Sequence, residues 1–294
     1  MAKLIINEEL LQQLELMQTL IKNNYAGMFG GNRQSRSYGS SCEFADYRDY
    51  MAGDDITKID WNAYARFERL YQKLYYDERQ MHTRIYIDAS RSMDYGKTKK
   101  SEQAVRIAAA IAYLSVCEMD KVSVYCINGK SLTQIIPPMV GKEAYLNSVN
   151  ALNGIEYSGD VCISDAIVPS NTGRGDGLSV IISDFLTDND FESAINHLAD
   201  RRRDVMCIQI LSKEEMNPQI RGRSHLFDSE NAEKTYRRNI DRDIAKAYKL
   251  ALEYSVSRVR DLCHSRGASY VLATAEESLS EIFFEKLVNT GVVK

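Results

Sequence analysis

The sequence lacks the long apolar runs that would place it in a membrane. None of its apolar stretches approaches the roughly 18 consecutive residues that a membrane-spanning helix requires. The N-terminal stretch MAKLIINEELLQQLELM has early acidic side chains and no small-residue cleavage site, so we expect no signal peptide. These absences favour a cytoplasmic protein that does not insert directly into a membrane.

A strong excess of charge is missing as well. The chain has 37 lysine and arginine residues against 41 aspartate and glutamate residues, a formal net charge of −4 over 294 residues. A mildly acidic chain has no general attraction to nucleic acid or to an anionic membrane surface. We therefore expect protein partners and no nucleic acid.

Metal-binding patterns of cysteine and histidine are also absent. The six cysteines form no Cys-x-x-Cys pair, and most stand among apolar residues, as in SVCEM and VMCIQI. This is typical of reduced, buried thiols in a cytosolic protein. The four histidines are scattered, so a zinc site has no support.

What the chain does have, from residue 83 onward, is a regular alternation of short apolar strands and helices. The predicted strands are TRIYIDAS, 121–127, 132–138 at a sheet edge, 178–185, 204–211, a short one at 222–228, and 268–275. Continuous apolar strands separated by helices indicate a mostly parallel, Rossmann-like α/β sheet with helices on both faces. A helix of 101–119 is apolar nearly all round, and a long helix is predicted over about 232–266.

The first 80 residues do not follow this alternation. An amphipathic helix is predicted over 7–22, followed by a Gly-, Ser- and Arg-rich loop over 26–41. An irregular or β extension follows, with a turn at Gly53-Asp54-Asp55. We therefore divide the chain into an N-terminal helix with an extension, residues 1–80, and an α/β domain, residues 81–294.

Two polar loops follow predicted strands, where sheets of this class bind ligands. The first is DASRS (88–92) and the second contains ISDF (182–185). Residues at i, i+2 and i+4 of the first loop can direct one carboxylate and two hydroxyls at a single point. Such oxygen ligands, with Asp184, suit a hard cation such as Mg²⁺ and not zinc or copper. The alternative is that Asp88 and the two serines only cap the next helix.

Two enzyme-like patterns nearby are incomplete. GKT (96–98) resembles the end of a phosphate-binding loop, but Arg91 stands where that loop needs its first glycine. DFLTD (184–188) resembles the acidic metal motif of phosphohydrolases of the haloacid dehalogenase type. Those enzymes need an acid two residues after the nucleophilic aspartate, and Ser90 occupies that position.

Several motifs together resemble a known family. They are YRDY (47–50), GDD (53–55), IDW (59–61), DASRS (88–92), ISDF (182–185) and LFD (226–228). The combination is similar to the bacterial family catalogued as domain of unknown function 58. DASRS with ISDF resembles the metal-ion-dependent adhesion site (MIDAS) of von Willebrand factor A domains.

This resemblance implies a von Willebrand A-like α/β fold, a metal site used for protein binding, and no established catalytic activity. By position, Asp88, Ser90 and Ser92 match the first metal loop, and Asp184 matches the later metal aspartate. The implied cofactor is Mg²⁺ or another divalent cation. Family members are commonly encoded beside MoxR-type AAA+ ATPases, which implies such an ATPase and an unidentified client protein as partners.

One loop departs from the A-domain pattern, in which a threonine usually faces the metal. The matching stretch is YSGDV (157–161), which places Val161 at the threonine position. A valine cannot coordinate a cation, so Asp160 is the available replacement. A carboxylate there would further neutralise the cation and weaken its pull on an acidic partner.

We therefore expect a non-enzymatic protein-interaction module that works with the ATPase in chaperone-like assembly or activation of other proteins. Two alternatives stay open: a metal-dependent phosphoesterase using Asp88 and Asp184, and a metal-free scaffold, which Val161 favours. The GDD and IDW motifs favour structural roles, because acids beside turns often bond their own backbone. We expect the single tryptophan, Trp61, in the core.

Overall fold

The computed structural model describes residues 12–19, 44–75, 80–95, 98–170, 172, 174–187, 189–218, 222–227, 235–240 and 242–287. The chain divides into two compact units. One comprises Met1–Met28 and Met81–Lys294, and the other comprises Phe29–Gln80.

The described part of the N-terminal helix groups with the larger unit. Residues 12–19 are helical, with Leu14 and Met17 buried. The sequence-based division instead placed this helix with the N-terminal extension. The remainder of the helix predicted over 7–22, and the loop predicted over 26–41, lie outside the described residues.

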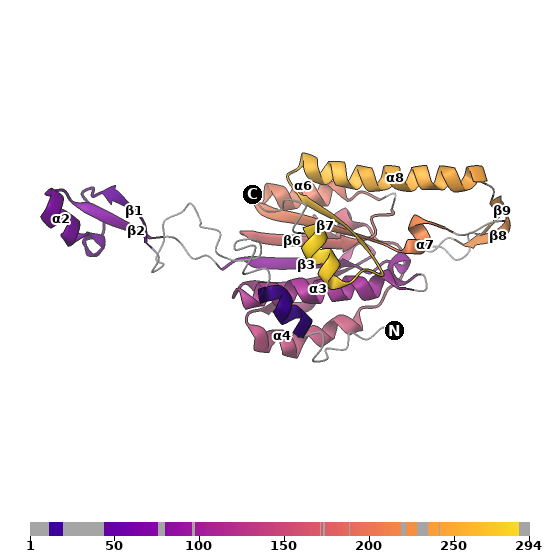
Figure 1. The fold of residues 1–294 in the computed structure, drawn as a ribbon, viewed down its shortest axis with the longest axis horizontal. Helices are drawn as coiled ribbons and strands as arrows, with labels where there is room; N and C mark the ends of the chain where they lie inside the picture. Colours follow the sequence, from indigo (N-terminus) through magenta and orange to yellow (C-terminus); the bar gives the residue numbers. More distant parts are fainter. Residues whose placement is uncertain are drawn as a thin grey trace. The chain divides into compact units, whose positions relative to one another are not determined.

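A six-stranded sheet forms the centre of the larger unit (Figure 1). Its strands are β3 (His82–Asp88), β4 (Lys121–Asn128), β5 (Ser131–Met139), β6 (Gly177–Ser183), β7 (Arg203–Leu211) and β10 (Ser269–Thr274). They lie in the order β10-β7-β6-β3-β4-β5, with all neighbours parallel except β5, which is antiparallel to β4. The chain builds outward from β3 on one side and from β6 on the other, as in doubly wound sheets. The predicted mostly parallel α/β fold is confirmed.

The edge strand predicted over 132–138 is confirmed as β5. Pro137 and Pro138 lie inside it, which an edge strand tolerates because one of its sides has no neighbouring strand to bond. The pairing with β4 shifts register in this region, between Val122 and Val124. The shift lets the strand continue past two residues that have no N–H donor.

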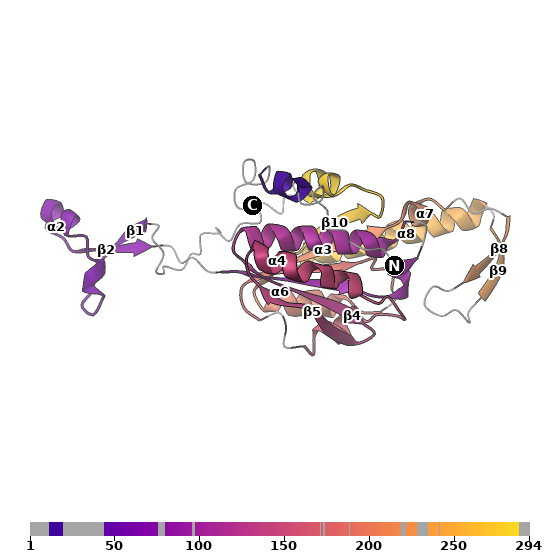
Figure 2. The same cartoon turned by 90° about the horizontal axis from the view of Figure 1, so that it is seen from below.

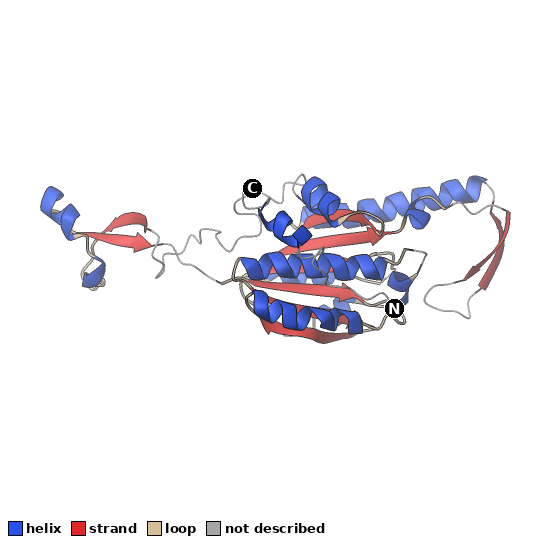
Figure 3. Cartoon of the chain, turned by 60° about the horizontal axis from the view of Figure 1, so that its bottom comes forward, coloured by secondary structure: helices blue, strands red, loops and turns tan. Residues whose placement is uncertain are grey.

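Helices cover both faces of the sheet (Figures 2 and 3). They are α3 (Lys100–Cys117), α4 (Lys142–Ser148), α5 (Ile163–Ile167), α6 (Glu192–Asp200), α7 (Lys213–Met216) and α8 (Arg242–Ser265), with the 3-10 helices η2 (Arg91–Asp94) and η3 (Val149–Gly154) and the π-helix η4 (Glu281–Leu287). α3 and α4 lie on one face, and α6 and α8 on the other (Figure 1). α3 is buried along almost its whole length, as its apolar sequence predicts. None of the helices in the described part combines the length and apolarity that crossing a bilayer requires.

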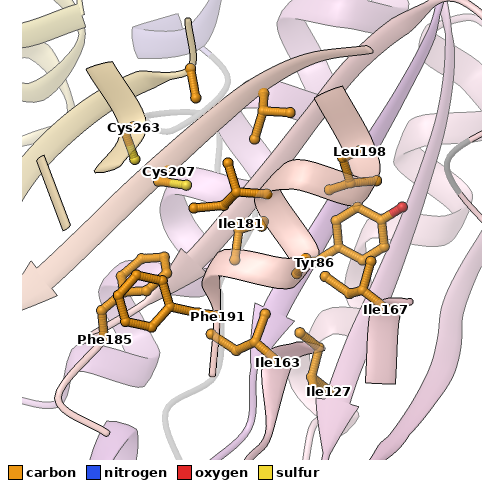
Figure 4. Close-up of a cluster of buried hydrophobic side chains, with 14 of the residues drawn as sticks. Tyr86, Ile127, Ile163, Ile167, Ile181, Phe185, Phe191, Leu198, Cys207 and Cys263 are labelled. Atoms are coloured by element: carbon orange, nitrogen blue, oxygen red, sulfur yellow. The ribbon is translucent and has the colours of Figure 1, made fainter. Parts of the chain in front are cut away.

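The core under α6 and α8 anchors one of the polar loops (Figure 4). Phe185 meets Phe191 edge to face, with ring centroids 5.4 Å apart, and the free thiols Cys207 and Cys263 are buried in the same cluster. Burying a large apolar side chain contributes roughly 1.5–3 kcal/mol. Since Phe185 follows Asp184 directly, this packing holds the loop that carries Asp184.

The prediction of a long helix over about 232–266 is wrong for its first residues. Residues Thr235–Ile240 form a strand, β9, which pairs antiparallel with β8 (Gly222–Phe227), and α8 starts only at Arg242. The segment TYRRNI contains β-branched and aromatic residues, and the partner strand supplies its hydrogen bonds. The short strand predicted at 222–228 is confirmed as β8.

The smaller unit is held together by its acidic turns. It contains β1 (Phe44–Asp49), η1 (Ile56–Lys58), α2 (Trp61–Phe67) and β2 (Tyr71–Tyr75), with β1 antiparallel to β2. Asp55 caps η1, and Asp60 caps α2 while accepting a hydrogen bond from Tyr47 Oη at 2.8 Å. That bond is the largest cause lowering the pKa of Asp60, to about 2. These contacts agree with the structural roles expected for GDD and IDW.

Trp61 contradicts the expectation that the single tryptophan is a core residue. It is 58% exposed, at the first turn of α2. Asp60 caps α2, and no residue of this short helix is buried, so the helix has no core side for the ring to enter. Its neighbour Phe67 is 65% exposed.

We predict that Gly177→Ala destabilises the larger unit. Gly177 begins β6 with φ of +138°, and an added Cβ would lie 2.4 Å from the main-chain oxygen of His82. We expect a loss of about 2–4 kcal/mol in the free energy of unfolding, measured in urea. Gly154→Ala is the control, because no atom lies within 4 Å of its added Cβ. Equal losses in the two variants would contradict the prediction.

Candidate functional site

Two loops meet at the carboxyl edge of the sheet. Asp88 is the last residue of β3, and Asp184 follows the end of β6. The two strands run parallel with Ile87 opposite Ile182, so Asp88 lies beside Ser183. The strand order reverses at this pair of strands, which is where sheets of this class bind ligands.

A chain of hydrogen bonds connects the side chains of the two loops. Ser183 Oγ donates to Asp88 Oδ2, and the Ser90 amide donates to Asp88 Oδ1 at 2.7 Å. The hydroxyl oxygens of Ser90 and Ser92 lie 2.9 Å apart, and Ser92 Oγ donates to Asp184 Oδ2 at 2.8 Å. The structure therefore brings Asp88, Ser90, Ser92 and Asp184 together, and we call these four residues the edge cluster. Their role as metal ligands stays a prediction.

The capping alternative explains only part of the edge cluster. Asp88 does bond the Ser90 amide, as a residue that shapes a turn would. Ser90 stands at the N-cap of η2, yet its hydroxyl makes no capping hydrogen bond. The serine hydroxyls are thus directed at each other and at Asp184.

The remaining predicted ligand, Asp160, is engaged by other groups. Its Oδ1 accepts from the Val161 amide at 2.7 Å, and its Oδ2 accepts from Asn189 Nδ2 at 2.9 Å. The side chain of Val161 is buried in the core. A role for Asp160 as a further ligand also stays a prediction.

The loop before Asp160 braces the edge cluster through its main chain. The Arg91 amide donates to the Gly159 carbonyl at 2.9 Å. The hydroxyl of Tyr157 in this loop is buried and has no hydrogen-bond partner among the described residues. Burial raises the pKa of Tyr157 above its ordinary value. A buried hydroxyl without a partner is a position for a water molecule or a ligand.

Sequence reasoning missed Lys100, the first residue of α3. Its side chain is fully buried, and Nζ donates to Asp184 Oδ2 at 2.7 Å and to Glu215 Oε1 on α7. Burial alone would lower the pKa of Lys100, but the two carboxylates outweigh it and raise the pKa above its ordinary value. No signal in the sequence distinguishes it, since the helix was predicted to start at 101 and Lys100 follows another lysine, Lys99, just before it.

The edge cluster and its ion partners carry excess negative charge. Three carboxylates (Asp88, Asp184 and Glu215) face one ammonium (Lys100), so the formal charge is −3 + 1 = −2 when all are ionised. Burial and then the charge of Asp184 raise the pKa of Asp88, hydrogen bonds from Ser183 and Ser90 lower it, and the net result is a pKa of about 6. This imbalance is one that a divalent cation would neutralise.

The donor set fits a hard divalent cation. It consists of oxygens only, from two carboxylates and two hydroxyls, as Mg²⁺ prefers. Within the described residues, no group of three or more His, Cys, Asp or Glu side chains could hold a metal ion. A cation at the edge cluster would therefore depend on the serine hydroxyls. Gly96 and Lys97 of the incomplete phosphate-loop pattern lie outside the described residues.

Comparison with known proteins gives one family match. The family described as "Protein of unknown function DUF58" matches residues 46–256. An uncharacterised protein of Mycobacterium bovis and one of Mycobacterium tuberculosis are each 25% identical over 235 residues, covering 77% of this chain and 73% of theirs.

Similar solved structures share little sequence with this chain. One is an aerotolerance-related membrane protein from Bacteroides fragilis, with 15% identity and a TM-score of 0.39, covering 64% of this chain and 98% of that one. Another is the SpRpn10 VWA domain, with 12% identity and a TM-score of 0.37, covering 72% of this chain and 95% of that one.

We predict that the Asp88 carboxyl makes a pH-dependent contribution to the stability of the fold. Its pKa rises from 3.8 to about 6 on folding, so the folded state holds the proton more tightly. This contribution is fully present below about pH 4 and is lost as the pH rises to about 6, on the order of 2–3 kcal/mol. As the pH rises over this interval, in EDTA, the wild type should therefore lose stability relative to Asp88→Asn. Melting temperatures from thermal unfolding followed by circular dichroism would show this.

Two comparisons isolate this effect. Asp120, whose pKa burial also raises to about 6, titrates in both proteins and cancels in the difference. Asp165→Asn is the control, because the hydrogen bond from Lys130 lowers the pKa of this exposed carboxyl and leaves it ionised over the interval. Parallel profiles for the wild type and Asp88→Asn would contradict the prediction.

Proposed function

The chain belongs to the DUF58 family, and from that premise we propose that it is a non-enzymatic protein-interaction module whose docking point is the edge cluster. The observation that carries the proposal is the hydrogen-bonded convergence of Asp88, Ser90, Ser92 and Asp184 from two loops at the carboxyl edge of the sheet. The cluster is oxygen-rich and carries excess negative charge, which supports a divalent cation there, Mg²⁺ by preference.

Each residue of the edge cluster has a part in this mechanism. Asp88 and Asp184 supply negative charge, and Ser90 and Ser92 supply oxygens without charge. A bound cation would supply positive charge that attracts an aspartate or glutamate of a partner protein. Because the two serines do not neutralise the cation, part of its charge remains for the partner.

The main chain at Asp184 is held by a buried polar network. Gln209 Nε2 donates to the Asp184 carbonyl at 2.7 Å, and Tyr270 Oη donates to Gln209 Oε1 at 2.6 Å. Gln209 and Tyr270 lie on β7 and β10 and are buried. Such satisfied networks fix a geometry more than they add stability, which suits a docking point that must keep its shape.

The smaller unit supports an interaction role by its exposed apolar side chains. Met51, Ile56, Trp61 and Phe67 are each 58–65% exposed. A cavity of about 510 Å³ is lined by Tyr47, Asp60, Asn62, Ala63, Arg66, Phe67 and Tyr71. Exposed apolar surface of this kind marks protein-binding regions. We assign the unit to partner binding for this reason.

The identity of the partner rests on the family resemblance alone. We propose a MoxR-type AAA+ ATPase as the partner and chaperone-like assembly or activation of an unidentified client protein as the outcome. In this proposal the edge cluster is the docking point, and the apolar surface of the smaller unit adds to the contact.

A metal-free scaffold is the second candidate, and Lys100 favours it. The ammonium of Lys100 already lies beside the Asp184 carboxylate and neutralises its charge. A protein that recognised its partner by shape would need no further cation.

We predict that partner binding depends on the edge cluster and on the cation. Titration calorimetry of the full chain against a nucleotide-free MoxR-type ATPase of the same organism should show affinity falling about tenfold or more when EDTA replaces Mg²⁺, or in Asp88→Ala. Asp165→Ala, at an exposed carboxylate, should bind as the wild type does. An affinity that changes neither with EDTA nor in Asp88→Ala would overturn the proposed docking point. An affinity that falls in Asp88→Ala but is unchanged by EDTA would favour the metal-free scaffold.

We also predict no phosphoesterase activity. Both oxygens of Asp88 accept hydrogen bonds, and Ser90 stands where a general acid would be needed. Hydrolysis of p-nitrophenyl phosphate with Mg²⁺ should therefore not exceed that of Asp88→Ala. A rate well above this variant would revive the enzyme alternative.

A further inference from the structure

We propose that Lys100 is a built-in cation of the edge cluster, which holds Asp184 when no metal is bound and sets how tightly a divalent cation binds. The inference rests on the proposed function, because it takes the edge cluster as the cation site. It adds a residue outside the motifs that carry the resemblance.

The geometry places the Lys100 ammonium beside an oxygen that a metal would use. Its Nζ lies 2.7 Å from Asp184 Oδ2, and the same oxygen accepts the hydrogen bond from Ser92 Oγ at 2.8 Å. A cation bound by Ser92 and Asp184 would therefore approach an oxygen that already has an ammonium beside it. Two positive charges a few ångströms apart in a water-poor site repel each other strongly.

Burial makes this ammonium a fixed part of the site. Lys100 is 0% exposed at the first position of α3, a helix that is buried against the sheet. Its stem cannot swing into solvent without unpacking the start of that helix. A divalent cation must therefore bind in the presence of the ammonium and cannot simply displace it.

Glu215 is the second carboxylate that holds Lys100. Its Oε1 accepts from Lys100, and its Oε2 accepts from the Ser212 amide at 2.7 Å, in a capping box that fixes α7. Glu215 thus balances the pull of Asp184 and links the edge cluster to the segment that leads from β7 into β8. Because these ions together keep a formal charge of −2, cation binding stays favourable but is weakened by Lys100.

The first test compares Lys100→Met with Lys99→Met by titration calorimetry with Mg²⁺ on the full chain. Lys99 is the adjacent residue, but it pairs with Asp94 at the surface. We expect Lys100→Met to bind Mg²⁺ about tenfold more tightly or better than the wild type, a change of about 1.4 kcal/mol. Lys99→Met should match the wild type.

A second variant separates the local ammonium from net charge and from folding. Lys100→Met alone leaves the Glu215 carboxylate without its ammonium partner. We therefore expect this variant to have a lower melting temperature than the wild type in EDTA. The double variant Lys100→Met/Glu215→Gln removes one positive and one negative charge. The formal charge of the site therefore stays at −2, as in the wild type. It should still gain Mg²⁺ affinity, and Mg²⁺ should raise its melting temperature more than that of the wild type.

Equal Mg²⁺ affinity in the wild type and in both Lys100 variants would overturn the proposal. A gain in Lys100→Met that disappears in the double variant would also overturn it, because net charge would then explain the gain. These outcomes are independent of the partner titration. The Lys100 proposal can fail while Asp88→Ala still abolishes partner binding, and it can succeed where the proposed docking role fails.

Discussion

Two carboxylates are buried beside each other where parallel strands end, and the surrounding side chains offset their repulsion. Ser183 donates to Asp88, while Ser92 and Lys100 donate to Asp184. The pKa of Asp88 is nevertheless raised to about 6, mainly by burial and then by Asp184, so the offset is incomplete. A protein that keeps such an arrangement at a loop-rich edge bears a cost in stability there, and strained or charged arrangements of this kind tend to occur at functional sites.

The scaffold around this pair consists of buried, regular elements. Asp88 ends a strand with parallel neighbours on both sides, Asp184 precedes the core residue Phe185, and Lys100 starts a buried helix. Binding sites on such elements hold their geometry more closely than sites on free loops. Recognition of different partners would then come from less constrained regions, such as the apolar surface of the smaller unit around Trp61.

The sheet and the meeting of Asp88 with Asp184 were predictable, because continuous apolar strands indicate parallel pairing and parallel neighbours end at the same edge. The role of Lys100 was not predictable, because Lys99 and Lys100 are consecutive in the sequence. Only the tertiary position of Glu215 shows which of the two lysines is buried in an ion network. The strand β9 was also missed, since its polar, arginine-rich sequence continues the pattern of the helix after it and only pairing with β8 makes it a strand. Trp61 is exposed because the short helix that it begins buries none of its residues, which its apolarity alone does not reveal.

The prolines at the open margin of the sheet have a consequence for behaviour in concentrated solution. β5 is the outermost strand on its side, and Pro137 and Pro138 remove two N–H donors from it. Prolines and a register shift in an edge strand hinder pairing with a strand of another copy, so edge-to-edge association through β5 is disfavoured. The backbone of β5 is therefore a poor template for a strand of a second copy.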